Sequence, residues 1–207
     1  MTSIERMYAL YKATAYVALH GIPGDLVECG AWRGGSAMLM AYTLLERGGP
    51  LPKLHLYDTF AGMPPADRVD VDVLGRLANK LLETSPRTAA VWGVASMDEV
   101  AANMRRNGYP PELIAFVPGR VEEPLPDKAP MQASLLHLDT DWYASTKHEL
   151  THLFPRLSAG GVLIIDDYGH WRGARAATDW FFAQCREPVL LSRIDYTGRI
   201  AVRLGRG

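Results

Sequence analysis

Three aspartates in this sequence have the type and spacing expected of a metal site. Asp139 follows the apolar segment 134–138, and the pair Asp166 and Asp167 follows the apolar segment 161–165. The separation corresponds to one helix plus one strand, so two neighbouring parallel strands would bring the three carboxylates together. Carboxylate oxygens are the ligands of hard cations such as Mg²⁺. We therefore predict that these aspartates bind Mg²⁺ or a similar cation, although each could instead cap the helix that follows it.

A glycine-containing turn at residues 29–35 is the second candidate site. It lies between a short strand that ends at Glu28 and a helix that begins near Ser36, and it contains Gly30 and Gly34. Glycine allows the backbone to approach a ligand closely. The spacing differs from G-x-G-x-x-G, and an acid at the start of the turn is poorly placed for a pyrophosphate. The turn therefore favours a cationic or amine-bearing ligand, and a purely structural turn is the alternative.

Asp58 ends the second predicted strand, which covers residues 53–57. In nucleotide-binding sheets an acid at this place accepts hydrogen bonds from ribose hydroxyls. Asp58 could also cap the turn at residues 59–62. Together with the turn after Glu28, it favours a ligand of the adenosine type.

The elements predicted around these acids alternate between strands and helices, which indicates βαβ units and a mostly parallel sheet. The apolar run at 162–165 is typical of a strand covered on both faces. The predicted strands are 25–28, 53–57, 114–117, 134–138 and 161–165, followed by a hairpin of 189–194 and 199–204. The predicted helices are 3–19, 36–46, 71–83, 145–154 and 174–185, and one that a capping box opens at Ser96 and that ends at Asn107.

We therefore expect a single α/β domain over residues 1–207. Its core should be a doubly wound, mostly parallel sheet of about seven strands with a C-terminal antiparallel hairpin. In open sheets of this class, ligands bind beyond the carboxyl ends of the strands. Because Glu28, Asp58, Asp139 and the pair 166–167 lie at such ends, the candidate sites should share one rim of the sheet.

The composition argues against several classes of protein. With 22 basic and 23 acidic residues the chain has a formal net charge of −1, so it lacks the basic excess of a nucleic-acid-binding protein. No apolar run reaches the roughly 18 residues of a membrane span, and the first 20 residues do not read as a secretion signal. The two cysteines give no disulfide framework. We expect a cytoplasmic protein with no nucleic-acid or membrane partner.

Four segments, in order and in spacing, resemble the TylF/MycF family, which is typified by macrocin O-methyltransferase. The segments are DLVECGAWRGG at 25–35, YDTFAGMP at 57–64, HLDTDWYAST at 137–146 and IDDY at 165–168. The resemblance implies a Rossmann-like methyltransferase that depends on S-adenosylmethionine and Mg²⁺ and acts on sugar hydroxyls of natural products, in antibiotic biosynthesis. It also implies a homo-oligomer and a small-molecule acceptor with a sugar hydroxyl or vicinal diol.

The resemblance also assigns roles to individual residues. It implies that the turn that starts at Glu28, with Gly30, Trp32, Arg33 and Ser36, holds the methionine part of the cofactor and that Asp58 holds the ribose. Ser96, Gly119 and Arg120 match positions near the adenosine. Asp139, Asp166 and Asp167 match the metal ligands, and Asp139 also matches the candidate general base.

The predicted reaction is an in-line displacement at the methyl group of the sulfonium. A cation that chelates two neighbouring acceptor oxygens would lower the pKa of the hydroxyl and fix the line of attack. Asp139 could accept the proton, but a carboxylate bound to a cation is a weakened base. His170 is the second candidate, because a histidine pKa of about 6.5 suits the task. Trp32, Trp142 and Trp171 could line the pocket or belong to the core.

Four alternatives remain open from the sequence. A methyltransferase with the same metal chemistry could act on a catechol or phenol. The segment 148–152 matches H-E-x-x-H, the zinc-hydrolase helix, but its two histidines lie opposite the apolar face of Leu150, Leu153 and Leu157 and are predicted to face solvent. A nicotinamide oxidoreductase would need the missing G-x-G-x-x-G. A non-catalytic adenosine-binding module would not need the three aspartates.

Overall fold

The computed structural model describes residues 2–205, in which seven strands form one sheet. The strand order is β3-β2-β1-β4-β5-β7-β6, and β7 is antiparallel to both of its neighbours, whereas the other pairs are parallel. The strands are β1 (Asp25–Cys29), β2 (Leu54–Asp58), β3 (Ile114–Pro118), β4 (Ala133–Leu138), β5 (Leu157–Ile165), β6 (Ser192–Arg193) and β7 (Arg199–Val202). The predicted mostly parallel sheet with a C-terminal antiparallel hairpin is confirmed.

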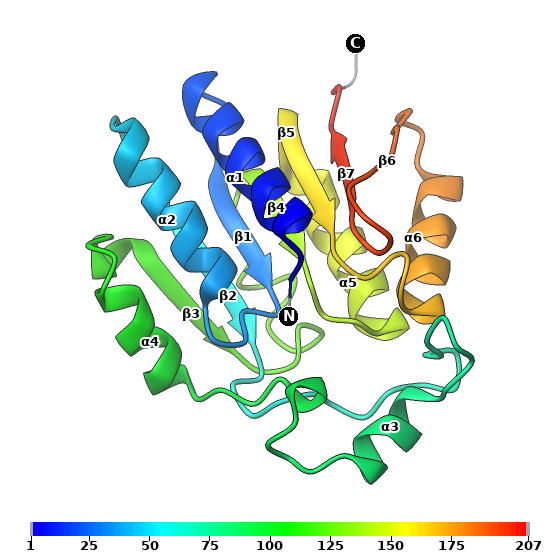
Figure 1. Ribbon diagram of the computed structural model, residues 1–207. Coiled ribbons are helices and arrows are strands. Elements are labelled where there is room, and N and C mark those ends of the chain that lie inside the picture. The colour runs from blue at the N-terminus through cyan, green and yellow to red at the C-terminus, as the bar shows by residue number, and fades with distance from the viewer. Residues whose placement is uncertain (1, 206–207) are drawn as a thin grey trace.

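Helices cover both faces of this sheet (Figure 1). The α-helices are α1 (Ile4–Leu19), α2 (Gly35–Arg47), α3 (Ala78–Thr84), α4 (Met97–Arg105), α5 (Tyr143–Leu153) and α6 (Arg172–Gln184), with short 3₁₀ turns at 90–92, 111–113 and 154–156. The first core cluster joins α1, α2 and α4 to one face, and the second joins α5 and α6 to the other. No helix among residues 2–205 has the length and apolarity that crossing a membrane requires.

Side chains alternate between the two cores along the central strands. Leu26 and Leu135 pack towards α1 and α2, whereas Val27 and Leu136 pack towards α5. All six residues of β4 are buried. Because a strand covered on both faces has no polar side, it appears in the sequence as a continuous apolar run, and the predictions of β4 and β5 rested on such runs.

Serine caps set the start of two helices on the α1 side. The Ser3 side chain accepts a hydrogen bond from the Arg6 N–H, and the Ser96 side chain accepts one from the Glu99 N–H. Each bond satisfies an N–H group that has no partner within the helix. The N-cap predicted at Ser96 is therefore confirmed, as is the helix that it opens, whereas the Glu99 side chain of the predicted capping box pairs with Arg33.

The helix predicted over 71–83 is wrong in its first half. Only α3 is helical, and Val71 instead forms an isolated antiparallel bridge with Leu77. Asp72 accepts hydrogen bonds from the N–H groups of Leu74 and Arg76, which closes a tight turn. Gly75 in that turn has a φ of 84°, a conformation that no α-helix contains, so the helix can begin only after it. β5 and α6 also begin earlier than predicted, at Leu157 and Arg172.

The segment 59–95, which contains α3, crosses the carboxyl ends of the strands (Figure 1, bottom). Ala66 and Leu82 of this segment share a third core cluster with Trp142 and Trp171. The Asp72 backbone also bridges to Trp171, just before α6. The segment is therefore packed as a cover over the rim at which the candidate site lies.

Candidate functional site

A cavity of about 370 Å³ opens at the carboxyl ends of the central strands, where the open-sheet rule places ligands. Most of the predicted site residues line it: Gly30, Trp32, Asp58, Gly119, Arg120, Asp139, Asp166, Asp167 and His170. Four predicted residues do not: Glu28, Arg33, Ser36 and Ser96. Met63 and Val91, from the covering segment, complete the wall.

The β1–α2 turn needs glycine at two positions. Gly30 has a φ of 88°, and a Cβ atom there would overlap the Asp139 carbonyl oxygen. Gly34 has a φ of 79° and caps the N-terminus of α2 in the left-handed conformation. Residues with a Cβ rarely adopt this conformation. These glycines therefore let the turn lie directly against the end of β4, so that two candidate sites share one cavity.

Asp58 holds the backbone around the cavity. Its Oδ2 accepts a hydrogen bond of 2.8 Å from the Trp32 N–H, and its Oδ1 accepts one of 2.8 Å from the Phe60 N–H. Gly119, at the end of β3, donates to the Asp58 carbonyl oxygen at 3.0 Å. Burial raises the pKa of the Asp58 carboxyl, and the N–H groups of Phe60 and Trp32 oppose the rise. The carboxylate therefore joins the turn after β1 to the strand ends and still faces the cavity.

Three of the four predicted residues that do not line the cavity have other partners, and Ser36 lies in the first turn of α2. Glu28 is fully buried behind the cavity wall, with its Oε1 3.3 Å from the Nδ1 of His137. Burial raises the pKa of Glu28, and His137 opposes the rise. Arg33 is exposed and pairs with Glu99 at 3.3 Å, whereas the Ser96 hydroxyl caps α4.

Carboxylates crowd the ends of β4 and β5, where Asp166 and Asp167 are buried and Asp139 is partly exposed. The ligand atoms of His137, Asp139 and Asp166 lie within 4.8 Å of one another, the spacing of a metal site. Burial raises the pKa values of Asp139 and Asp167 well above the ordinary range, and the neighbouring acids raise them further. Asp141 belongs to the same cluster and interacts with Asp167.

The cluster has the features of a cation site. Asp166 Oδ1 and Asp167 Oδ2 are buried and have no hydrogen-bond partner of normal length among the described residues, and the Nε2 of His137 lies 3.6 Å from Asp166 Oδ1. Buried acids at this density repel one another unless a cation compensates them. Carboxylate oxygens suit Mg²⁺. Although burial alone would lower the pKa of His137, Asp166 and Glu28 raise it well above the ordinary value, so His137 would add a nitrogen ligand by losing its proton. The donor set therefore fits a divalent cation. The group with metal-ligand spacing consists of His137, Asp139 and Asp166, whereas the predicted group had Asp167 in place of His137.

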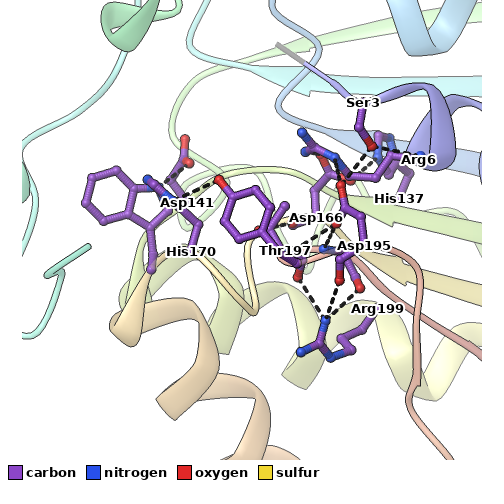
Figure 2. A network of polar contacts seen from close by, with 12 residues as sticks. Ser3, Arg6, His137, Asp141, Asp166, His170, Asp195, Thr197 and Arg199 are labelled. Atoms are coloured by element: carbon purple, nitrogen blue, oxygen red, sulfur yellow. Dashed lines mark hydrogen bonds and ion pairs between the residues drawn. The ribbon is translucent and has the colours of Figure 1, made fainter. Parts of the chain in front are cut away.

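Among the described residues, the guanidinium of Arg6 reaches the cluster. Arg6 extends from α1 and pairs with Asp166, and its Nε lies 3.2 Å from Asp195 (Figure 2). Ser3 Oγ donates to the same Asp195 at 2.7 Å. Although burial alone would raise the pKa of Asp166, its bonds to His137 and Arg6 hold it below the ordinary value. Asp166 is therefore the most readily ionised acid of the cluster.

Three residues of this site are not among the sequence predictions: Arg6, His137 and Asp141. His137 had a signal, because it precedes Asp139 by two residues on a strand and so lies on the same face. Asp141 also had a signal, because it follows the predicted ligand Asp139 by two residues and lies just before α5. Arg6 had no local signal, since its partners Asp166 and Asp195 belong to the far end of the chain.

Comparison with known proteins decides the family. Residues 1–202 match the family described as macrocin O-methyltransferase (TylF). The chain belongs to this family. It is therefore an S-adenosylmethionine-dependent O-methyltransferase, and the predicted resemblance is confirmed. Family membership decides against the nicotinamide oxidoreductase, the zinc hydrolase and the non-catalytic binding module.

Three relatives of this TylF-family enzyme come from antibiotic-producing bacteria. The chain is 36% identical to a tetracenomycin rhamnosyl 4'-O-methyltransferase of Streptomyces olivaceus, over 98% of this chain and 69% of the relative. It is 31% identical to demethyldecarbamoylnovobiocin O-methyltransferase of Streptomyces niveus, over 96% of this chain and 73% of the relative. It is 30% identical to mycinamicin III 3''-O-methyltransferase of Micromonospora griseorubida, over 81% and 64%.

Solved structures show the same fold. The O-methyltransferase NovP is 30% identical and superposes with a TM-score of 0.81, over 98% of this chain and 81% of that one. The calicheamicin methyltransferase CalS11 is 20% identical, with a TM-score of 0.67 over 97% and 78%. The Rossmann-like methyltransferase fold predicted for the chain is therefore confirmed.

Asp141 and His170 both line the methyltransferase cavity. Asp141 has a φ of 68° and accepts a hydrogen bond of 2.7 Å from the Trp171 Nε1–H. Burial raises the pKa of Asp141 to about 6, although its bonds to Asp167 and Trp171 oppose the rise. His170 Nδ1 lies 3.1 Å from the Tyr196 hydroxyl, and burial lowers the pKa of this half-buried imidazole.

Trp32, Trp142 and Trp171 all line the cavity of the enzyme. Trp142 and Trp171 are buried and meet edge to face, with ring centroids 4.9 Å apart. Trp142 also donates from Nε1 to the Pro64 carbonyl oxygen at 3.1 Å. The sequence allowed these tryptophans to line the pocket or to belong to the core. The rings of Trp142 and Trp171 do both, because they form part of the cavity wall and of the third core cluster.

The H-E-x-x-H segment of the methyltransferase is not a metal helix, but its predicted exposure is wrong. His148 and His152 are half-buried, with ring centroids 4.3 Å apart, and His148 Nε2 lies 3.1 Å from the Leu125 carbonyl oxygen. The segment around Leu125 covers this part of α5, which helical periodicity alone does not show. Glu149 is fully buried. Among the described residues, no third ligand joins the two histidines.

Proposed function

We propose that this enzyme methylates a sugar hydroxyl on a glycosylated natural product, with a divalent cation such as Mg²⁺ beside the acceptor. The observation that carries the proposal is the cluster of buried acids at the ends of β4 and β5, inside the same cavity as Asp58. The relatives named for rhamnosyl-tetracenomycin, novobiocin and mycinamicin substrates support this class of acceptor.

The cofactor would lie between the β1–α2 turn and β2. Asp58 lines the cavity and is placed to accept hydrogen bonds from ribose hydroxyls. Gly119 and Arg120 line the same side and are close to the proposed adenosine position. Glu28 lies behind the turn, where its charge favours the amino group of the methionine part.

The cation would be held by Asp139, Asp166 and Asp167, with His137 close enough to take part. When bound, such a cation supplies Lewis-acid polarisation of the acceptor hydroxyl. Glu28 orients the imidazole of His137 from behind, an arrangement common where histidine ligates a metal. Arg6 compensates part of the negative charge at Asp166.

The acceptor proton would pass to a base of this chain. Asp139 and His170 both line the cavity, and the structure adds Asp141, which lines it too but lies outside the group with metal-ligand spacing. Asp141 is held in place by Trp171. We favour Asp141 over Asp139, because a carboxylate that binds a cation is a poorer base.

A mass-spectrometric acceptor screen tests this proposal. The purified enzyme is incubated with S-adenosylmethionine, Mg²⁺ and two sets of acceptors: rhamnosylated aromatic natural products, and the corresponding catechols without a sugar. The proposal predicts one added methyl group on the sugar of the first set, and Asp141→Asn should reduce kcat by a factor of about 100 or more. Methylation confined to the catechols would establish the phenol-directed alternative instead.

A further inference from the structure

Glu149 is a fully buried acid that the proposed reaction does not use. It lies on α5, below the cavity, and its side chain has 0% exposure. Its Oε1 accepts a hydrogen bond of 2.9 Å from the Thr140 hydroxyl. Its Oε2 has no hydrogen-bond partner among the described residues, and the Cys29 thiol is a neighbour of the carboxyl group.

The charges around Glu149 favour its neutral form. Its ionisable neighbours are Glu122, Asp141 and Cys29, which are acidic groups. Burial therefore raises the pKa of Glu149 to about 8, and the Thr140 and Cys29 bonds only partly oppose the rise. A carboxylic acid with a buried hydrogen bond costs far less than an unpaired buried charge.

Thr140 connects this acid to the cavity. It lies between Asp139 and Asp141, which both line the cavity. Its carbonyl oxygen accepts hydrogen bonds from the Trp142 N–H at 2.8 Å and from the Ser145 hydroxyl at 3.3 Å. Thr140 therefore lines the cavity itself, while its carbonyl oxygen is bonded by the start of α5 and its hydroxyl group by Glu149.

The backbone at this place needs such support. Asp141 has a φ of 68°, in the left-handed region that a residue with a Cβ adopts at a cost of about 1 kcal/mol or more. Strained backbone persists only where the surrounding contacts over-determine it. The Thr140 hydroxyl gives the loop one contact to the helix interior directly next to the strained residue.

We propose that Glu149 is a positioning residue, whose buried carboxyl group holds Thr140 and thereby fixes the loop that presents Asp139 and Asp141 to the cavity. The proposal rests on the proposed function, because it gives that loop a cation ligand and a candidate base. Glu149 acts only through Thr140 and does not touch the cofactor or the acceptor.

A measurement of Mn²⁺ binding tests the proposal. Binding is monitored by electron paramagnetic resonance, in which the signal of free Mn²⁺ decreases as the ion binds the protein. Thr140→Val keeps the shape of the side chain and removes the hydroxyl, and Glu149→Leu removes the acceptor. Both should weaken Mn²⁺ binding on the order of tenfold. Their S-adenosylhomocysteine affinity without cation should stay within about twofold of wild type, since Asp58 is held by other contacts.

Two variants provide matched controls. Glu149→Gln keeps a neutral group with a carbonyl acceptor for Thr140, so its Mn²⁺ affinity should stay within about threefold of wild type. Thr151→Val makes the same change on the same helix, where the hydroxyl bonds only to the Lys147 carbonyl oxygen, and should have no effect. The double variant Thr140→Val with Glu149→Leu should be no weaker than either single one, because both remove the same hydrogen bond.

The outcomes separate this proposal from the proposed function. The positioning role would be overturned if Thr140→Val bound Mn²⁺ with the affinity of the wild type. It would also be overturned if Glu149→Gln and Glu149→Leu lost Mn²⁺ affinity equally. If Glu149→Leu does not fold, Thr140→Val alone decides. If the wild type binds no Mn²⁺, the cation part of the proposed function fails. The positioning role is then decided by kcat, measured with an acceptor. A kcat of Thr140→Val equal to that of Thr151→Val would overturn the positioning role.

Discussion

The acids around the cavity are chemically alike but have different partners. Asp166 is paired with Arg6 and His137, and these bonds lower its pKa below the ordinary value despite burial. Asp139 and Asp167 lie among other acids, and burial and repulsion raise their pKa values. Glu149 has no cation beside it at all among the described residues. The position of each residue relative to Arg6 and His137 therefore decides which acids are charged.

Glu149 makes the stability of the protein depend on pH. Its pKa is raised from 4.5 in the unfolded chain to about 8 in the folded protein. Between these values the unfolded chain has lost a proton that the folded protein keeps, so the contribution of Glu149 to folding falls as the pH rises through this window. The slope is at most about 1.4 kcal/mol per pH unit.

Glu149→Gln removes this dependence. Urea unfolding at pH 5.5 and pH 7.5 should show that the variant gains stability over wild type at the higher pH, by about 2 to 3 kcal/mol. The control Glu112→Gln changes an exposed acid and should differ from wild type by the same amount at both values. A Glu149→Gln difference that is constant with pH would show that Glu149 is ionised in the fold.

Among the elements, α1 depends on a polar contact at its N-terminal end. Arg6 joins the helix to Asp166 after β5 and to Asp195 between β6 and β7 (Figure 2). The side chain of Arg6 has 12% exposure and that of Asp166 has 2%, so the pair is screened little by solvent. The contact therefore connects the first helix to the cation cluster and to the C-terminal hairpin.

Arg6→Met should destabilise the protein by about 2 to 4 kcal/mol, because it leaves Asp166 and Asp195 without their guanidinium partner. Differential scanning fluorimetry and urea unfolding measure the loss. The control Arg47→Met removes an exposed arginine whose contact to Tyr11 is long, at 3.5 Å, and should cost less than about 0.5 kcal/mol. Equal losses in the two variants would mean that Arg6 contributes only an ordinary surface charge.

The elements also show what the sequence could predict. The strands that end in Asp58, Asp139 and Asp166 are buried on both faces and appear as apolar runs bounded by turns, so their place in the fold was predictable. The cover at 59–95 was not, since side chains satisfy much of its backbone. Asn79, for example, bonds both the N–H and the carbonyl group of Ala66. No period in the sequence encodes such contacts.

The site residues also divide into those that the sequence could predict and those that it could not. Asp58, Asp139 and Asp166 lie at strand ends, so topology places them at one rim. The contacts of Arg6 with Asp195 and of Glu149 with Thr140 depend on how helices pack over that rim. Periodicity gives the buried face of a helix but not the identity of the group that a buried acid meets, which is why the exposure of 148–152 was predicted wrongly.

At the scale of the whole molecule, the sheet concentrates negative charge at one rim while the formal net charge of the chain is only −1. The cavity lies between this rim and the covering segment, which shares a core cluster with Trp171. A cation that binds only the folded protein would compensate the repulsion and stabilise the entire fold.

Mg²⁺ should therefore raise the melting temperature, by about 5 to 11 °C at a concentration 100 times its dissociation constant. The increase should disappear with EDTA and in Asp139→Asn, but persist in Asp98→Asn, which changes an exposed acid on α4. The same increase in all three proteins would indicate a general salt effect and not a site at the rim.

The most direct test of the central claim is a calorimetric titration of S-adenosylhomocysteine into the wild type and Asp58→Ala, each with and without Mg²⁺. We predict saturable binding to the wild type and a loss of at least about tenfold in Asp58→Ala, because the carboxylate has no substitute at the end of β2. The control Asp98→Ala should bind like the wild type. Equal affinity in Asp58→Ala and the wild type, or no binding in any condition, would contradict the placement of the cofactor in this cavity.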